Sequence, residues 1–261
     1  MKLNEKVAIV TGGGRGIGRA IALGFAREGA NVVIASRTES KIEEVAEEIR
    51  KLGRRSLAIK TDVCKEEDVK NMLEKALEEF SHIDILVNNA GIGMTLAAGG
   101  PRRIKDLETE IWDEIIDTNL RGPFLCAKYV LETMEAQRSG SIINISGAGI
   151  TKEGKGIMSR NSGAGYAPYG VSKFGLERLT QILASEMEDF NVAVNTLRPG
   201  RQVDTDLNRG MPRRAENLLK PEVLVPSAVF LATQDAKGVT GESINALKWN
   251  EEHGIDQTLE P

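Results

Sequence analysis

The amino-acid sequence predicts one α/β domain: a doubly wound, seven-stranded parallel sheet with helices on both faces. Short apolar runs alternate with helical patterns along the 261 residues, and this order of elements is typical of a parallel sheet. The runs are continuously apolar, as in strands that are covered on both faces. No linker or change in composition divides residues 1–261, so we expect a single domain.

The seven expected strands are apolar runs bounded by polar residues or glycine. In order they are KVAIVTG (6–12), NVVIAS (31–36), RSLAIKTDV (55–63), IDILVNNAG (83–91), GSIINISG (140–147), NVAVNTLRPG (191–200) and GESINAL (241–247). The expected helices repeat apolar residues three and four apart and cover 16–28, 38–52, 65–80, 112–138, 169–189 and 221–233. Pro123 predicts a break or kink in the longest one, because proline cannot donate the helical hydrogen bond.

Three long loops interrupt this pattern, at 91–105, 147–168 and 200–220. Each follows a strand and therefore lies at the carboxyl end of the sheet, where open α/β sheets bind ligands. Structureless loops of this length are uncommon unless they serve a function. We expect residues 1–147 to form a cofactor-binding part and the three loops to form the substrate site.

Composition excludes several functional classes. The net charge of −4 argues against nucleic-acid binding, which needs a basic surface. No apolar run is long enough to span a membrane, and no signal-peptide pattern follows Met1. The chain has two cysteines and two histidines, which predicts a cytoplasmic location and no metal site.

The stretch VTGGGRGIGRA follows the first strand and opens the first helix. It does not fit the P-loop, because Arg19 and Ala20 replace the required Lys and Ser/Thr. It does not fit G-x-G-x-x-G either, but it does fit T-G-x-x-x-G-x-G. A helix amino terminus attracts phosphate, and glycines let the backbone approach it. A tight turn is the simpler alternative, but it would need fewer glycines.

Further motifs follow in a fixed order. They are Thr11-Gly12-x-x-x-Gly16-x-Gly18, Asn88-Asn89-Ala90-Gly91, Asn119, Ser146, Tyr169-x-x-Ser172-Lys173 and Pro199-Gly200. Together they resemble the short-chain dehydrogenase/reductase family, classical type, across nearly the whole chain. The resemblance implies a Rossmann-type fold and an NAD(P)-dependent oxidoreductase, which moves a hydride between nicotinamide and a small-molecule carbonyl or alcohol carbon.

The end of the second strand predicts which cofactor is preferred. An acidic residue there binds the ribose 2′-OH of NAD, whereas arginine accommodates a 2′-phosphate. Here Ser36 takes the acidic position, Arg37 follows it and Arg15 lies in the glycine loop, so we expect NADP(H) to be preferred over NAD(H). The other cofactor contacts implied by the resemblance are Gly12, Gly16, Ile17, Gly18, Asp62, Val63, Asn89, Ala90, Gly91, Tyr169, Lys173, Pro199 and Gly200.

Tyr169 and Lys173 are four residues apart on an expected helix and share one face. A neighbouring ammonium group lowers the pKa of a phenol toward the working range. By resemblance, Tyr169 exchanges a proton with the substrate, Lys173 also holds the ribose hydroxyls, and Asn119 positions a water molecule. Tyr166 has the spacing to Lys173 of a divergent enoyl (C=C) reductase branch. We prefer Tyr169 and expect Tyr166 to be a wall of the substrate pocket.

The catalytic serine departs from the family pattern. The common string is N-x-S-S, and here it is NISG, with Gly147 in the usual catalytic place. Three accounts are open: Ser146 turns inward at a distorted strand end, a residue of the long loop such as Ser159, Asn161 or Ser162 replaces it, or the donor is absent. We prefer Ser146. The absence of the donor would favour a cofactor-binding protein with weak or no catalysis.

Charge and helix patterning predict partners. The loops 92–105, 148–168 and 201–220 carry +3, +2 and +2 in a chain of −4, which favours an anionic or acyl-carrier-linked substrate. The helices 112–138 and 169–189 are apolar on more than one face. With the resemblance, this predicts a homotetramer built as a dimer of dimers.

Overall fold

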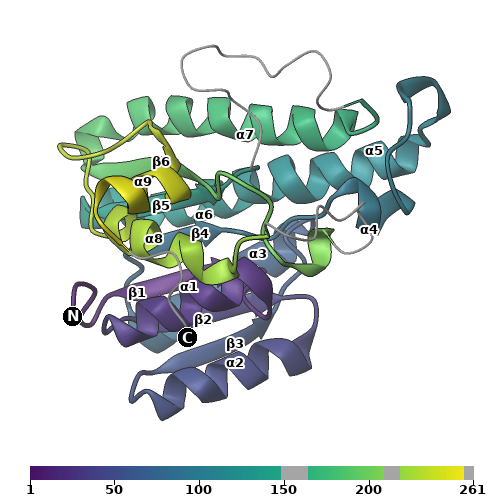
Figure 1. The fold of residues 1–261 in the computed structure, drawn as a ribbon. Coiled ribbons are helices and arrows are strands. Elements are labelled where there is room, and N and C mark those ends of the chain that lie inside the picture. The colour runs from purple at the N-terminus through teal and green to yellow at the C-terminus, as the bar shows by residue number, and fades with distance from the viewer. Residues whose placement is uncertain (148–163, 209–217, 256–261) are drawn as a thin grey trace.

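A computed structural model describes residues 1–147, 164–208 and 218–255 (Figure 1). Its seven strands form one parallel sheet, as predicted, in the order β3-β2-β1-β4-β5-β6-β7. The strands are β1 (Val7–Thr11), β2 (Asn31–Ser36), β3 (Ser56–Lys60), β4 (Ile85–Asn88), β5 (Gly140–Ile145), β6 (Val192–Arg198) and β7 (Ser243–Asn245). The strand order reverses between β1 and β4, and such a switch point forms a crevice at the carboxyl ends of the strands.

Helices cover both faces of this sheet (Figure 1). They are α1 (Gly16–Arg27), α2 (Glu39–Lys51), α3 (Glu66–Phe80), α4 (Met94–Ala98), α5 (Thr109–Ile116), α6 (Gly122–Gln137), α7 (Ala167–Glu186), α8 (Val225–Ala232) and α9 (Ala246–Glu252). Successive strand residues belong to opposite cores: Val10 lies in the core shared with α1, α2 and α8, and Ile9 in the core shared with α3, α6 and α7. Both faces are therefore buried, which explains why the strands are continuously apolar.

The observed helix differs from the one expected at 112–138 in where it begins and in its continuity. It begins earlier, at Thr109, and a π-helical turn at Asp117–Arg121 joins α5 to α6. Pro123 lies in the first turn of α6, where a missing N–H costs little. The wider turn before it accommodates the proline. The turn also contains Asn119, and π-helical turns are frequent at functional sites.

Two further differences concern segments expected to be irregular. The loop at 91–105 contains the short helix α4 and begins a 3₁₀ turn at Ile104–Asp106. The chain after β7 forms α9, whose first turn is capped by the Asn245 side chain accepting a bond from the Lys248 N–H. The helix expected at 221–233 is a 3₁₀ turn, Pro221–Leu224, followed by α8.

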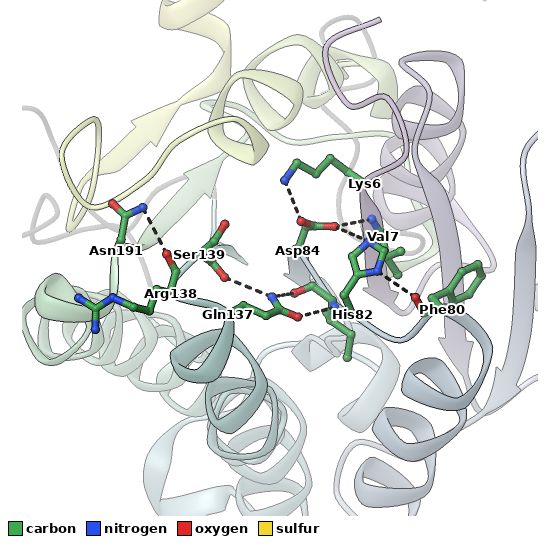
Figure 2. A network of polar contacts seen from close by, with 10 residues as sticks. Lys6, Val7, Phe80, His82, Asp84, Gln137, Arg138, Ser139 and Asn191 are labelled. Atoms are coloured by element: carbon green, nitrogen blue, oxygen red, sulfur yellow. Dashed lines mark hydrogen bonds and ion pairs between the residues drawn. The ribbon is translucent and has the colours of Figure 1, made fainter.

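Polar contacts join the amino ends of the strands, opposite the ligand-binding edge (Figure 2). The Asp84 carboxylate accepts bonds from the Lys6 ammonium at 2.8 Å and from the Val7 N–H at 2.9 Å. The Gln137 side chain bonds the Ile83 N–H and C=O at 3.1 and 2.8 Å. These contacts fix β1, β4 and α6 relative to one another and leave the carboxyl edge for ligands.

Candidate active site

A cavity of about 1450 Å³ lies at the carboxyl ends of the strands. Most of the residues predicted to bind cofactor or to act in catalysis line it. They are Gly12, Arg15, Gly16, Ile17, Ser36, Arg37, Asp62, Val63, Asn89, Ala90, Gly91, Ser146, Tyr169, Lys173 and Pro199. Gly18, Asn119 and Gly200 are not part of the lining.

Gly18 lies behind the cavity wall, against the side chain of Asn89. A Cβ atom added at Gly18 would be 2.4 Å from the Asn89 amide nitrogen and 2.5 Å from the Gly12 carbonyl oxygen. Gly12 has a φ of +63°, and a Cβ there would be 2.9 Å from the Cα of Ala90. These two glycines therefore make room for the end of β4, so the glycine loop approaches protein as well as the cavity.

Thr11 joins the same two strand ends, and its role was not apparent in the sequence. Its hydroxyl donates to the Val87 carbonyl at 3.2 Å and accepts from the N–H groups of Asn89 and Ala90, both at 3.1 Å. The Asn89 amide donates in return to the carbonyls of Thr11 and Gly12, at 2.9 and 3.1 Å. This reciprocal set of bonds fixes the glycine loop on β4.

Lys173 is buried on α7, and its Nζ donates a 2.8 Å hydrogen bond to the carbonyl of Ile145. Burial lowers the pKa of Lys173 to about 8, and the nearby Glu177 carboxylate opposes this shift. Burial also raises the pKa of Tyr169 to about 12. This direction is opposite to our expectation, because loss of solvent around the phenol is the cause of the shift and Lys173 does not lower it.

Asn119 is fully buried and its side chain is engaged by the protein. Its amide donates to the Ile92 carbonyl at 2.8 Å and to the Ser172 hydroxyl at 3.2 Å. Its oxygen accepts from the Ile92 N–H at 2.8 Å. Ser172 donates in turn to the Tyr169 carbonyl at 2.9 Å. The Asn119 side chain therefore joins the segment after β4 to the turn of α7 that carries the tyrosine.

Ser146 lines the cavity directly after β5. It is 5% exposed, and its buried hydroxyl oxygen has no hydrogen-bond partner among the described residues. An unsatisfied buried hydroxyl costs free energy, and a ligand oxygen would satisfy it. The alternative donors, Ser159, Asn161 and Ser162, lie outside the described residues.

An apolar cluster packs against Tyr169. It consists of Ile92, Met94 and Ile115, with partly buried neighbours that include Tyr166 and Tyr169. Tyr166 and Met94 also line the cavity. The arrangement provides an apolar wall beside Tyr169.

Charged residues lie at the end of the cavity formed by β2 and the glycine loop. Arg37 is exposed and has no ion pair within residues 1–147, 164–208 and 218–255. Arg15 pairs with Asp206, Nη1 to Oδ2, at 2.5 Å. The Ser36 hydroxyl is bonded to Thr38. Arg19, which also lines the cavity, pairs with Glu48 at 2.6 Å. The described wall therefore contains three guanidinium groups near the glycine loop, of which two are already paired.

In the part of the chain that the structure describes, no helix combines the length and apolar character needed to cross a membrane. Over the same residues, no three metal-ligating side chains of the His, Cys, Asp or Glu type come together. The two cysteines, Cys64 and Cys126, are free thiols.

Comparison with known proteins agrees with this geometry. The family model described as short chain dehydrogenase matches residues 6–216. The chain is 35% identical over 252 residues to the 3-oxoacyl-[acyl-carrier-protein] reductase FabG of Staphylococcus epidermidis, covering 92% of this chain and 97% of the relative. This chain therefore belongs to the short-chain dehydrogenase/reductase family and is an oxidoreductase.

Two solved structures are informative about ligands. A 3-ketoacyl-(acyl-carrier-protein) reductase from Brucella melitensis, complexed with NADH, has a TM-score of 0.81 and 31% identity, covering 93% of this chain and 97% of that one. A metagenomic short-chain oxidoreductase in complex with NADP has a TM-score of 0.77 and 29% identity, covering 94% and 97%. Proteins of this fold are thus seen with either nicotinamide dinucleotide.

Proposed function

We propose that this protein is an NADPH-dependent reductase of a carbonyl group, with a 3-oxoacyl chain on a carrier as its preferred substrate. The observation that carries the proposal is the convergence of Tyr169, Lys173 and the unsatisfied Ser146 hydroxyl on one cavity. The residues fit a dinucleotide, because the same cavity runs from Ser36 past the glycine loop to Lys173. When bound, the nicotinamide supplies the hydride.

The protein supplies the proton and the hydrogen bonds. With a pKa raised to about 12, Tyr169 is protonated at neutral pH and is ready to donate its proton to the carbonyl oxygen as that oxygen gains charge. Ser146 donates a hydrogen bond to the same oxygen. Lys173 brings a positive charge toward the phenolate that remains, and Asn119 fixes Tyr169 through Ser172.

The preference for NADPH is supported by charge. The position after β2 that would carry a carboxylate is Ser36, and Arg37 beside it is exposed. A guanidinium group binds phosphate strongly. The test is a fluorescence titration with NADPH and NADH, in which NADPH should bind more tightly. Replacing Arg37 by Ala and Ser36 by Asp together should reverse the preference.

The acyl-carrier substrate is supported by three observations. The curated relative and one solved neighbour are reductases of such substrates. An apolar wall of Ile92 and Met94 adjoins Tyr169. Arg201 is exposed and lines the cavity, and Arg102 and Arg103 are exposed in the loop at 91–105. These guanidinium groups attract an acidic carrier. Lys105, by contrast, is paired with Asp106 at 3.1 Å, which reduces the positive charge of the first loop.

The test is NADPH oxidation with an acetoacetyl group on acyl-carrier protein and with a neutral ketone. The specificity constant kcat/KM for the acyl-carrier substrate should fall steeply with added salt, and that for the ketone should not. Equal salt dependence would contradict the electrostatic part of the proposal. An enoyl substrate in the same assay tests the C=C reductase alternative. Binding of NADPH without turnover of any substrate would favour a cofactor-binding protein.

We also propose a homotetramer, a dimer of dimers, in which α6 and α7 form the main contact. Their outer faces expose Phe124 at 47%, Val171 at 50%, Phe174 at 54% and Ile182 at 41%. Exposed apolar patches of this kind mark interfaces. Light scattering at micromolar concentration should give four chains, and Phe174→Glu should reduce the number. A monomeric wild-type protein would refute this.

For the location, we propose the cytoplasm. The two cysteines are free, and burial raises the pKa of Cys126 to about 12, so this thiol is chemically inert. Fractionation of cells that express the protein tests the location.

A further inference from the structure

The segment that follows β6 is held against the cofactor end of the cavity by three consecutive residues. A Cβ added at Gly16 would be 3.1 Å from the Thr205 methyl group, and one added at Gly93 would be 3.4 Å from Leu207. Between them, Asp206 forms its 2.5 Å ion pair with Arg15. Thr205 therefore lies against the glycine loop and Leu207 against the segment after β4, and the Asp206 carboxylate between them pairs with Arg15.

The stem of this segment is also fixed. The Asp204 N–H donates to the Leu219 carbonyl at 2.8 Å, and the Leu219 N–H donates to the Gln202 carbonyl at 2.9 Å. These bonds belong to a parallel bridge between Val203 and Leu219. Asp206 thus follows closely on an anchored strand-like contact.

The chemistry of the pair resembles that of the expected ligand. A guanidinium group binds carboxylate and phosphate in the same planar, charge-assisted way. Arg15 and Asp206 line the same cavity as Ser36 and Arg37, the two residues beside which a 2′-phosphate is expected. Arg37 makes no ion pair with another described residue, whereas Arg15 already has an anionic partner.

We propose that Asp206 is a specificity-determining residue, whose carboxylate competes with the 2′-phosphate of NADP(H) for the Arg15 guanidinium. The inference rests on the proposed binding of NADP(H) in this cavity. NADH has a hydroxyl group in place of that phosphate and leaves the Arg15–Asp206 pair intact. Asp206 therefore weakens the binding of one cofactor and not of the other, so the chain is less selective than its two arginines alone would make it.

The size of the effect follows from exposure. The Arg15 and Asp206 side chains are 66% and 26% exposed, so solvent screens the pair. Ion pairs of this kind are weak, and breaking one changes a dissociation constant by up to about fivefold. NADPH must break the Arg15–Asp206 pair before its phosphate binds Arg15, and this costs little free energy. Asp206→Asn removes that cost.

The experiment measures the dissociation constants of NADPH and NADH by fluorescence titration, without substrate or turnover. Asp206→Asn should tighten NADPH binding about three- to fivefold and leave NADH binding unchanged. Asp204→Asn is the matched control, because it removes a carboxylate two residues away that also lines the cavity; it should change neither constant. In the Arg15→Ala background, Asp206→Asn should have no effect, whereas in the Arg37→Ala background its effect should persist.

Three outcomes overturn the inference. One is an Asp206→Asn protein that binds NADPH no more tightly than wild type while both cofactors still bind. Another is equal tightening by Asp204→Asn, which would show a general charge effect. The third is an Asp206→Asn gain that survives in Arg15→Ala. If wild-type protein binds neither cofactor, the proposed function itself fails. Thermal unfolding of each variant verifies that the fold is kept.

Discussion

The Nζ atom of Lys173 donates a 2.8 Å hydrogen bond to the carbonyl oxygen of Ile145. Ile145 ends β5, and Ser146 follows it directly. One bond therefore joins the helix that carries the tyrosine to the strand end that carries the serine. Because the pKa of the buried amine is about 8, protonated and neutral lysine are both populated near physiological pH.

The buried amine of Lys173 predicts a pH dependence of stability. Its folded pKa of about 8 lies below the unfolded value of about 10.4. Between these values the unfolded chain binds a proton that the folded protein does not, so the free energy of unfolding rises with pH in this window. Lys173→Met should lack this rise. Urea unfolding at pH 7 and 10.5 should show the difference between the two proteins changing by about 2–3 kcal/mol, and a constant difference would contradict the assignment.

Replacing Glu177 should shift the alkaline limb of the pH profile of kcat/KM. Its carboxylate raises the pKa of Lys173 and so opposes the effect of burial. Glu177→Gln should lower that pKa, so the lysine loses its charge at a lower pH and the alkaline limb of the kcat/KM profile moves to lower pH. Glu186→Gln, at the far end of α7, is the control. Superimposable profiles for Glu177→Gln and wild type would show that the carboxylate does not act on Lys173.

We expect substitutions of Tyr169 and Tyr166 to affect different kinetic parameters. Tyr169→Phe should lower kcat by about 10²–10⁴-fold, which is the contribution of a positioned proton donor, while NADPH still binds. Tyr166→Phe keeps the ring that packs beside Met94 and should change mainly KM. A stopped assay with the acetoacetyl substrate measures both parameters. A greater loss from Tyr166→Phe would favour the enoyl-reductase alternative.

Ser146→Ala separates catalysis from stability. Removing one hydrogen-bond donor to a developing oxyanion should lower kcat by about 10²–10³-fold. The Ser146 oxygen has no partner among the described residues, so the melting temperature should stay the same or rise slightly. Full activity in Ser146→Ala would transfer the role to the loop residues Ser159, Asn161 or Ser162, which the same assay tests one at a time.

Gly18→Ala tests the packing of the glycine loop. The new methyl group would lie 2.4 Å from the Asn89 amide nitrogen and 2.5 Å from the Gly12 carbonyl oxygen, so it should destabilise the protein by about 2–3 kcal/mol. Gly170→Ala is the matched control, since a Cβ there meets nothing within 4 Å and should stabilise α7 by about 0.5–1 kcal/mol. Chemical unfolding measures both.

The sequence predicted the order of strands and helices along the chain, and most of the site residues that it predicted line the cavity, because those signals are local. Apolar strand runs, helical periodicity and motif spacing can each be recognised within a short stretch of sequence. Helix α9 was missed even though Asn245 is a recognisable capping residue. The short α4 has too few residues for a periodic signal.

The relationships that the sequence did not predict are contacts between distant residues. Arg15 and Asp206 are 191 positions apart, and no local pattern marks them as partners. The pKa of Tyr169 was expected to fall because Lys173 is near in sequence. It rises because burial of the phenol, a property of the whole fold, dominates. Burial and pairing are tertiary properties, and motif spacing does not report them.

The bonds between Asn89 and the glycine loop have a consequence for protein engineering. The amide of Asn89 occupies the space that Gly18 leaves open and donates to the Thr11 and Gly12 carbonyls. Residues 12–18 therefore cannot be transferred alone. In another sheet, the space left open at Gly18 would lack the Asn89 side chain that fills it here. The transferable unit is the loop together with Thr11 and Asn89. Arg15 belongs to this loop, but its exposed side chain takes no part in these bonds, so cofactor choice can be redesigned there while the loop keeps its shape.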